Sequence, residues 1–455
     1  MRTSPLTGVT DVSRCGRFRV PDVLTAVDSE SAQRRVAGAL GARGIGDGDR
    51  VVLAVPGSAD YVSVVLGAAR SGVVPVPLDP RLTSYERDAI IRDVEPALVI
   101  DDAAALTTLF SGDAIELDDW PRCRPMHFTS GTTGRPKGVW SGLLSAEHAA
   151  ALVAEERELW GFASDDLDLV VSPIYHSAPL RFAMGTLLAG GAISVLPAFD
   201  PEAFVDAVHD LHPTSMFCVP AHLQRLFAWL DEHDASLDAS SFRLVAHAGA
   251  PCPEPVRRRA HETFGADVVW EFYGSTEGQF TACPAPEWIA RPGTVGRARP
   301  GRVVAADGDG QLWCTVPEWA RFTYWNAADK TRAVWRETPD GPAFTVGDLG
   351  RVEDGYVYLD SRREDLIISG GVNVYPAEVE AALADADGLV DLAVFGRQDA
   401  AWGQRVCAAY VGDVDEEALR ALAAERLTPP KRPKTYEKVA SLPRTATGKV
   451  RRTEL

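Results

Sequence analysis

One stretch of this chain decides how the rest is interpreted: Met126-His127-Phe128-Thr129-Ser130-Gly131-Thr132-Thr133-Gly134-Arg135-Pro136-Lys137-Gly138-Val139. A short apolar run leads into a loop of hydroxyls and glycines that ends on a lysine. Glycines allow tight turns, and successive backbone N–H groups in such a turn form a nest for an anion. The hydroxyls add donors, and the lysine adds a point charge suited to phosphate. We therefore predict a phosphate-binding loop made of Ser130, Gly131, Thr132, Thr133, Gly134 and Lys137.

Lysine is scarce in this sequence, which makes its positions informative. Only six of the 46 basic residues are lysine, and the others are arginine. One lysine closes the loop just described, and another, Lys449, follows Thr447 and Gly448 near the carboxyl end. Because arginine serves nearly everywhere else, we expect both lysines to have specific roles.

Composition limits the classes of function. The chain has 455 residues, 46% of them hydrophobic and 24% charged, which is typical of a globular protein of two or more domains. Its net charge of −18 argues against nucleic acid as a partner, because a surface that binds nucleic acid is broadly basic. The seven cysteines include no Cys-x-x-Cys pair, and no apolar run is long enough for a membrane span. With no secretory pattern at the amino end, these features predict a cytoplasmic protein.

Short apolar strands alternate with helices from residue 51 onward. Strands are predicted at 51–55, 73–76 and 97–100, with helices at 60–70 and 84–94 between them. After the phosphate loop the alternation resumes, with strands at 167–174, 192–196, 216–219, 242–247 and 268–270 and helices at 146–159, 201–211, 221–230 and 254–264. Continuous apolar strands joined by helices form parallel sheets that are covered on both faces. The predicted fold class is therefore α/β, with a large amino-terminal domain of parallel-rich sheets.

Two later regions differ from this pattern. Between about 290 and 360, short strands and Asp-Gly turns predict a small β-rich subdomain. A compact α+β block follows, with helices at 376–383 and 416–426 and strands at 393–395 and 406–411. We place the domains at 1–361 and 362–455.

Polar residues follow several strands, at the ends where an open α/β sheet binds ligands. The strand at 268–270 runs into Glu271-Phe272-Tyr273-Gly274-Ser275-Thr276-Glu277-Gly278, which combines aromatic rings, glycines, hydroxyls and carboxylates. Two other strands end in His247-Ala248-Gly249-Ala250-Pro251 and in Tyr175-His176-Ser177-Ala178-Pro179. A histidine after an apolar strand is often structural, so the roles of His176 and His247 stay open at this point.

These stretches resemble the signatures of the AMP-forming adenylating superfamily, which comprises acyl-CoA synthetases, adenylation domains of peptide synthetases and luciferases. The first loop resembles its phosphate-binding signature, and the segment 273–277 resembles its Tyr-Gly-x-Thr-Glu motif. Further matches are Thr345-Val346-Gly347-Asp348, the segment 367–380 around Gly370-Gly371, and the segment 442–450 around Lys449. The resemblance covers roughly residues 50–455, and the sequence around His176 is closest to bacterial acyl-CoA synthetases. His247 and Val346 depart from the pattern.

The resemblance implies a role for each matched residue. The residues implied to bind ATP are Ser130, Gly131, Thr132, Thr133, Gly134, Lys137, Gly249, Ala250, Pro251, Glu271, Phe272, Tyr273, Gly274, Thr276, Asp348, Arg362 and Lys449. Those implied to be catalytic are Lys137, Thr276, Glu277 and Lys449, with Glu277 as the ligand of Mg²⁺. The acid would lie near His176, His247 and Gly274, a hinge at Glu364, and CoA beside Gly370 and Gly371.

The function that the resemblance implies is ATP-dependent, AMP-forming ligation of a carboxylic acid to a thiol, with CoA as the expected thiol. The carboxyl-terminal block would be a mobile lid that first brings Lys449 to the α-phosphate and then presents Gly371. Two alternatives remain open: a stand-alone domain that loads a carrier protein, and an ATP-dependent diazotase that activates nitrite and couples it to an aryl amine. A catalytically silent relative is disfavoured, because Lys137, Glu277, Asp348 and Lys449 are all retained.

Overall fold

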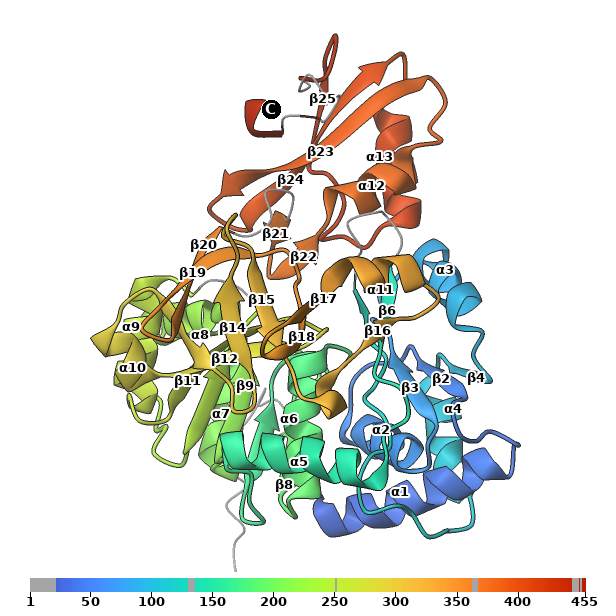
Figure 1. Ribbon diagram of the computed structural model, residues 1–455, viewed down its shortest axis with the longest axis vertical. Helices are drawn as coiled ribbons and strands as arrows, with labels where there is room; N and C mark the ends of the chain where they lie inside the picture. Colours follow the sequence, from blue (N-terminus) through green and yellow to red (C-terminus); the bar gives the residue numbers. More distant parts are fainter. Residues whose placement is uncertain (1–21, 130–135, 250–251, 362–366, 444–449, 451) are drawn as a thin grey trace, which may run out of the picture.

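The computed structural model describes residues 22–129, 136–249, 252–361, 367–443, 450 and 452–455. Four sheets belong to the large amino-terminal part, and a fifth belongs to the carboxyl-terminal part, which is drawn in orange and red at the top of Figure 1. Helices cover these sheets. The predicted α/β class is therefore confirmed.

The largest sheet has ten strands in the order β1-β8-β7-β9-β10-β11-β12-β13-β20-β19. The five strands from β8 to β11 are parallel, as the alternation of strands and helices predicts, whereas the strands flanking them on both sides pair antiparallel. Their bounds are β1 Val23–Thr25, β7 Leu167–Val170, β8 Ala192–Val195, β9 Ser215–Cys218, β10 Leu244–His247, β11 Val269–Gly274, β12 Gln279–Pro284, β13 Thr294–Ala298, β19 Leu349–Glu353 and β20 Tyr356–Ser361.

Strand β7 is shorter than the predicted strand at 167–174. It leaves the sheet after Val170, and Pro173 in the following segment has no N–H with which to continue a ladder. The carboxyl ends of β7, β9, β10 and β11 therefore open into loops at one edge of the sheet.

Alternating residues of β10 face two different cores. Val245 packs in a core with residues of the helices α7, α8 and α9, whereas Leu244 and Ala246 pack against an aromatic cluster that includes Trp160 and Phe272. This period of two buries both faces of the strand.

The helices are α1 Ala26–Gly41, α2 Ala59–Arg70, α3 Ser84–Val94, α4 Ala103–Thr108, α5 Ala146–Trp160, α6 Ser177–Leu188, α7 Pro201–Leu211, α8 Pro220–Glu232, α9 Glu254–Phe264, α10 Ala285–Ala290, α11 Ala328–Val334, α12 Pro376–Leu383 and α13 Glu416–Arg426.

Local sequence signals set the helix starts. Helix α7 begins where the Asp200 carboxylate accepts from the backbone N–H of Ala203 at 3.0 Å, with Pro201 in its first turn. Helix α3 begins with a capping box between Thr83 and Glu86. These caps explain why the predicted bounds of both helices are correct.

A small parallel sheet of β2 (Arg50–Leu53), β3 (Val74–Pro77) and β4 (Leu98–Ile100) has the order β3-β2-β4. Pro75 lies in β3, at an edge, where a missing N–H is tolerated. The region predicted to be β-rich forms a four-stranded sheet of β14 (Val303–Ala306), β15 (Leu312–Thr315), β18 (Gly341–Phe344) and β17 (Trp335–Thr338).

A third small sheet joins distant parts of the chain and has the order β16-β6-β5. Strand β5 (Phe128–Thr129) pairs antiparallel with β6 (Lys137–Trp140), so that Thr129 and Lys137 are register partners at the base of the predicted phosphate loop. Strand β16 (Thr323–Tyr324) pairs with the other edge of β6. The sheet thus places Lys137 near the β-rich region.

The carboxyl-terminal sheet consists of β21 (Ile367–Ser369), β22 (Val372–Val374), β23 (Leu389–Asp399), β24 (Gly403–Gly412) and β25 (Thr435–Lys438). Helix α13 and the segment after it contact α3 of the amino-terminal part. The Lys431 ammonium lies 3.2 Å from the Glu86 carboxylate and 2.6 Å from the Glu378 carboxylate of its own domain. The Thr83 hydroxyl donates to the backbone carbonyl of Arg426 at 2.9 Å. These contacts hold the two parts against each other.

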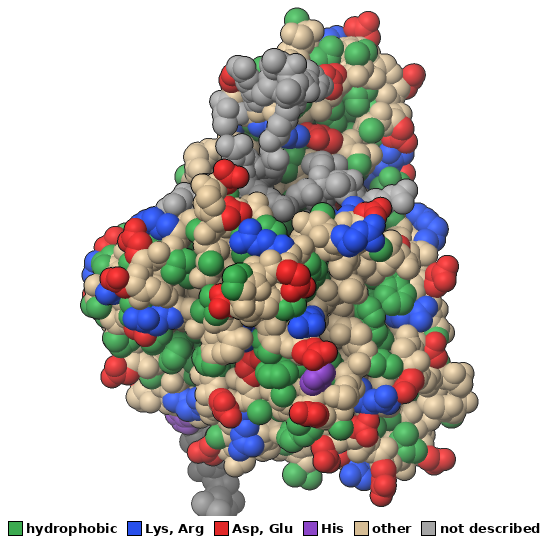
Figure 2. All heavy atoms as spheres, in the orientation of Figure 1, with side chains coloured by type: hydrophobic (Ala, Val, Ile, Leu, Met, Phe, Trp, Pro, Cys, Tyr) green, Lys and Arg blue, Asp and Glu red, His purple; other side chains and the backbone are tan. Residues whose placement is uncertain are grey.

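The surface carries mixed charge. On the face drawn in Figure 2, acidic and basic side chains are interspersed over both parts of the molecule. Among the described residues, no helix combines the length and the apolar character that crossing a membrane requires.

Candidate active site

A cleft of about 1730 Å³ lies between the two parts of the molecule and collects many of the predicted site residues. Most come from the amino-terminal part and two come from the carboxyl-terminal part. The predicted site residues that line it are Lys137, His176, Gly249, Phe272, Gly274, Thr276, Glu277, Asp348, Gly370 and Gly371. Residues separated by more than 230 positions in sequence thus share one cavity.

Tyr324 connects the two charged residues on the floor of this cleft. Its hydroxyl donates to Glu277 at 2.8 Å, and the Lys137 ammonium lies 4.8 Å from the centre of its ring. The arrangement is possible because β16 carries Tyr324 and pairs with β6, which begins at Lys137. Glu277 is only 8% exposed and still faces the cleft. A lysine and a carboxylate held this close can bind a phosphate and a cation side by side.

Tyr273 and Asp348 form a second pair, of which Asp348 lines the cleft whereas Tyr273 is only 4% exposed and does not line it. The Tyr273 hydroxyl donates to the Asp348 carboxylate at 2.6 Å, and the Tyr273 ring stacks on Phe280 with centroids 4.8 Å apart. Glycine is required next to them, because a Cβ on Gly274 would lie 2.8 Å from the backbone oxygen of Gly278. A glycine at this position therefore allows the tight turn that follows β11.

The carboxyl-terminal part contributes a turn of two glycines. Gly370 and Gly371 join β21 to β22 and line the cleft. Gly371 has φ +79° and no other atom within 4 Å of where its Cβ would lie, so its backbone is open to the cavity. A molecule that enters between the two parts meets bare backbone here.

Glu271 and His247 lie away from the cleft, although both were predicted to be site residues. They are register partners on β11 and β10, and neither lines the cavity. The Glu271 carboxylate is paired with the Arg257 guanidinium of α9 at 2.8 Å. Burial raises the pKa of Glu271 to about 7, and the neighbouring Arg257 opposes that rise. Burial also lowers the pKa of His247 to about 3, with Arg257 as a further cause.

His176 does face the cleft. It precedes α6 as the N-cap residue, and its ring lies 4.7 Å from that of Tyr175. The Tyr175 hydroxyl in turn accepts from Arg81 at 2.6 Å. The position suits a residue that lines the path of a ligand.

Several predicted residues lie outside the described part of the chain, so their predictions stand as they were made. They are Ser130, Gly131, Thr132, Thr133, Gly134, Ala250, Pro251, Arg362, Glu364 and Lys449. The domain boundary at 361/362 falls beside this group and is likewise still a prediction.

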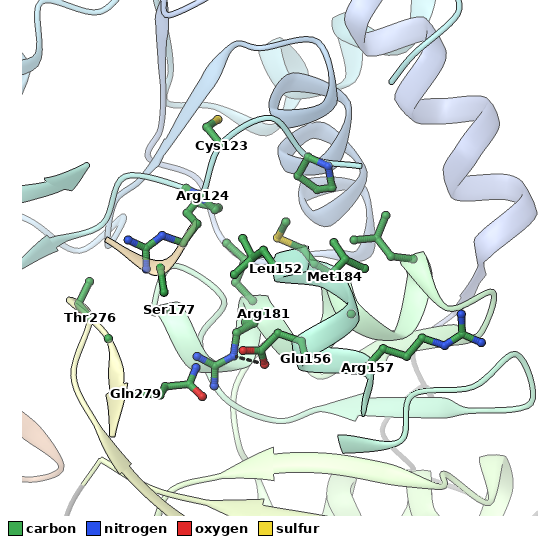
Figure 3. Close-up of a pocket in the computed structure, with 18 of the residues that line it drawn as sticks. Cys123, Arg124, Leu152, Glu156, Arg157, Ser177, Arg181, Met184, Thr276 and Gln279 are labelled. Carbon is green, nitrogen blue, oxygen red and sulfur yellow. Dashed lines mark ion pairs between the residues drawn. The ribbon is translucent and has the colours of Figure 1, made fainter. Parts of the chain in front are cut away.

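Sequence reasoning missed two features of the site. Tyr324 belongs to no motif, and only its position among aromatic residues in a β-rich region could have drawn attention to it. The second is a group of arginines, Arg124, Arg181, Arg299 and Arg302, around a smaller cavity next to the cleft; Figure 3 labels the first two. They come from three separate segments, so no local pattern could have brought them together.

Glu277 fits the predicted Mg²⁺ site chemically. Mg²⁺ usually takes one or two carboxylates, together with water and the phosphate oxygens of a substrate. A single buried carboxylate beside a lysine supplies the protein's share of such a set, and its Tyr324 partner fixes the orientation of the carboxylate.

Comparison with known proteins agrees with this geometry. The sequence pattern described as AMP-binding enzyme matches residues 22–120 and 123–314, and that of the AMP-binding enzyme C-terminal domain matches residues 378–449. Indoleacetate–CoA ligase of Aromatoleum aromaticum is 32% identical over 92% of this chain and 90% of its own.

Two solved structures share the fold. One is o-succinylbenzoate CoA synthetase (MenE) from Bacillus subtilis bound with its product analogue OSB-NCoA, with TM-score 0.83, 24% identity, and 94% of this chain and 92% of that chain covered. The other is the amide bond synthetase McbA from Marinactinospora thermotolerans, with TM-score 0.80, 25% identity, and 95% and 94% covered. The family patterns span most of the chain, and its curated relatives include several CoA ligases, matched over about nine tenths of their length. This chain therefore belongs to the AMP-binding enzyme family, as an enzyme of the AMP-forming acid–CoA ligase group.

Proposed function

We propose that the protein activates a carboxylic acid with ATP and then transfers the acyl group to CoA. The observation that carries the proposal is the composition of the cleft. Lys137, Thr276 and Glu277 line it from one part, and Gly370 and Gly371 line it from the other. One cavity thus combines groups suited to a nucleotide with an open backbone turn suited to a second ligand.

In the first step, a carboxylate oxygen of the acid attacks the α-phosphorus of ATP. A bond from that oxygen to phosphorus forms as the bond to pyrophosphate breaks, and the electron pair leaves with pyrophosphate. Lys137 would hold the departing phosphates and Thr276 would donate to the α-phosphate, so positioning and charge neutralisation supply the catalysis. Mg²⁺ on Glu277 would neutralise charge on the phosphates.

The nucleoside end would lie beside Tyr273 and Asp348. Asp348 is suited to accept from the ribose hydroxyls, and the Tyr273 ring to pack against adenine, with Gly249 leaving room for the base. The bond of 2.6 Å between the two side chains supports this arrangement, because it holds Tyr273 beside Asp348, which lines the cleft. Arg362 would complete the ribose contacts.

In the second step, a thiol attacks the carbonyl carbon of the acyl-adenylate, and AMP leaves. Gly370 and Gly371 would border the path of the thiol. The domain arrangement supports this assignment: the TM-score is 0.83 with MenE bound to OSB-NCoA and 0.65 with MenE in complex with the acyl-adenylate OSB-AMP. We propose that the part from 362 onward rotates about Glu364 between the two arrangements and carries Lys449 to the α-phosphate in the first.

A lysine substitution tests the proposal. Lys449→Ala should abolish adenylate formation, measured as acid-dependent exchange of pyrophosphate into ATP, while thioester formation from supplied acyl-adenylate and CoA continues. Lys438→Ala is the matched control, because its ammonium is exposed and bonds only to Asp413 among the described residues, at 3.2 Å. Near-normal exchange in Lys449→Ala would reject the role of Lys449, and no AMP release with any acid and CoA would reject the function.

A second candidate is supported by the similarity to McbA, whose name describes an amide bond synthetase. The acceptor would then be an amine, either with a carboxylic acid as the activated group or, in a diazotase, with nitrite in its place and an aryl amine as acceptor. AMP release that depends on an amine rather than on CoA would favour this candidate. A carrier protein in place of CoA is tested in the same assay, by thioester formation on its phosphopantetheine arm.

A further inference from the structure

A smaller cavity of about 140 Å³ adjoins the cleft behind Thr276. The two cavities share Ser177, Arg181, Ser275, Thr276 and Gln279 as lining residues. Figure 3 shows Thr276 and Gln279 on one side of this cavity, and Arg181 and Glu156 pointing toward each other at its centre. A ligand whose reacting group lies at Thr276 can therefore extend into it. We call this space the arginine pocket.

The arginine pocket is lined by the exposed Arg157 of α5 and by four further arginines from three segments: Arg124 before β5, Arg181 on α6, and Arg299 and Arg302 after β13. Three of these, Arg181, Arg299 and Arg302, pair with two neighbouring glutamates of α5. Arg299 lies 2.8 Å from Glu156 and 3.0 Å from Glu155. Arg181 lies 3.1 Å from Glu156, and Arg302 lies 2.6 Å from Glu155. Three positive charges thus share two carboxylates, and Arg124 and Arg157 bring the arginines around the pocket to five.

Several guanidinium nitrogens in this group have no hydrogen-bond acceptor among the described residues. They are Nε of Arg124, Nη2 of Arg181, Nε and Nη1 of Arg299, and Nε of Arg302, whereas Nε of Arg181 faces the Glu156 carboxylate at 3.1 Å. The Arg299 side chain is only 1% exposed, so its unused donors cannot turn to bulk solvent. Leaving buried charged donors unpaired is costly, and an anion in the cavity would satisfy them.

Arg124 and Arg181 remain charged at neutral pH in spite of this environment. Burial and the neighbouring arginines lower the pKa of Arg124 and of Arg181 to about 10. Arg124 differs from the other three because its described bonds include no carboxylate. Its Nη2 donates to the backbone carbonyl of Arg321 at 3.1 Å. Arg124 is therefore the arginine with most capacity left for a ligand.

We propose that the arginine pocket binds a second anionic group on the substrate, so that the acid activated here is a compact dianion such as a dicarboxylate. One carboxylate lies at Thr276 and reacts with ATP, and the other lies among the arginines. The size of the pocket restricts the spacer, because a cavity of about 150 Å³ admits a single benzene ring. A short chain or one ring fits between the two carboxylates, and a long alkyl chain does not. This inference rests on the proposed function and names its class of substrate.

Matched acids test the proposal with the unaltered protein. Each dicarboxylate is compared with its monocarboxylate and with the methyl ester of its far carboxylate, for example terephthalate with benzoate and monomethyl terephthalate, and succinate with butyrate and monomethyl succinate. CoA-dependent AMP release gives kcat/KM for each. In at least one set, we expect kcat/KM for the dicarboxylate to exceed that for the monocarboxylate and for the methyl ester by about 30-fold or more. A buried site with paired charges strongly favours a charged group over a neutral one.

A substitution identifies the residue responsible. Arg124→Gln should lower kcat/KM for the preferred dicarboxylate by about 10- to 100-fold, which is the effect of one hydrogen bond to a charged group. In the same variant, kcat/KM for the monocarboxylate should stay within about threefold of that of the unaltered protein, and the KM for ATP should be unchanged. Arg35→Gln is the matched control, since Arg35 is exposed on α1 and lines neither cavity.

The outcomes separate the two proposals. If no acid of either kind supports AMP release, the proposed function fails. If monocarboxylates are used as efficiently as their dianionic partners, only the present inference is overturned. The inference would also be overturned if Arg124→Gln lowered kcat/KM equally for dicarboxylates and monocarboxylates. If that variant does not fold, the comparison of acids with the unaltered protein decides alone.

Discussion

Two glutamates of one short segment are almost equally buried and yet belong to different parts of the molecule. Glu271 is 7% exposed and Glu277 is 8% exposed. The first lies within β11 against Arg257 of α9, and the second lies in the loop after β11, in the cleft with Tyr324. The difference shows that burial does not mark a functional carboxylate. The marker is whether its partners leave it open to a cavity.

The largest effect should come from removing the charge in the cleft. Glu277→Gln keeps the shape of the side chain and its bond from Tyr324, so the melting temperature should change by no more than about 2 °C. Exchange of pyrophosphate into ATP should fall by about 100-fold or more, because a group that stabilises charge on the phosphates is lost. A variant that keeps full exchange would remove Glu277 from the site.

The same substitution at Glu271 should give the reverse result, a loss of folding stability with little change in pyrophosphate exchange. Glu271→Gln leaves the buried Arg257 without its counter-charge, and losing one partner of a buried pair costs about 3 kcal/mol or more of folding stability. Chemical unfolding measures this loss. In the folded fraction, exchange should stay within about threefold. A fall in exchange as large as that of Glu277→Gln would instead place Glu271 at the nucleotide.

The smallest effect concerns His247, the register partner of Glu271. Burial lowers the pKa of His247 to about 3, below its ordinary value of 6.5. The unfolded chain therefore binds the extra proton first, and the free energy of unfolding falls as pH drops below about 6.5, by about 2 kcal/mol at pH 5. His247→Gln should lose this part of the acid sensitivity.

Unfolding by urea at pH 7 and at pH 5 checks the prediction. Arg257 and Glu271 face His247, and both remain in the variant, so the difference between the proteins isolates the histidine. The elevated pKa of Glu271 acts in the opposite direction, since its folded form holds a proton more readily. His209→Gln, at an exposed position, is the control. Equal acid sensitivity in His247→Gln and in the unaltered protein would contradict the assignment.

Local signals predicted much of the fold. Helices α3, α7 and α9 begin and end where predicted, because the capping residues and prolines that set their bounds are adjacent to them in sequence. The parallel strands from β8 to β11 followed from their continuous apolar character. The antiparallel extension of that sheet through β12, β13, β20 and β19 was not predicted, since the pairing of strands far apart in sequence leaves no local pattern.

The site divides in the same way. Motifs placed Lys137, Thr276, Glu277 and Asp348 in one cleft, and the structure brings them together. Motifs could not separate Glu271 from Glu277, because Glu271 lies within β11 and its partner Arg257 comes from α9, a contact that leaves no signal in the adjacent sequence. The arginine pocket could not be predicted from the sequence for another reason. Its arginines and their glutamate partners come from four segments and meet only in the folded chain.

The contact between Lys431 and its two glutamates has a consequence for any swing of the carboxyl-terminal part. Lys431 and Glu378 belong to the carboxyl-terminal part, which would move in the proposed rotation, whereas Glu86 belongs to the amino-terminal part. Undocking separates Lys431 from Glu86 and leaves its shorter contact, to Glu378, in place. The cation therefore travels with its own counter-ion, and only one carboxylate has to be rehydrated. Dissolved salt should ease that step, which makes ionic strength a control on how readily the two halves of the cleft part.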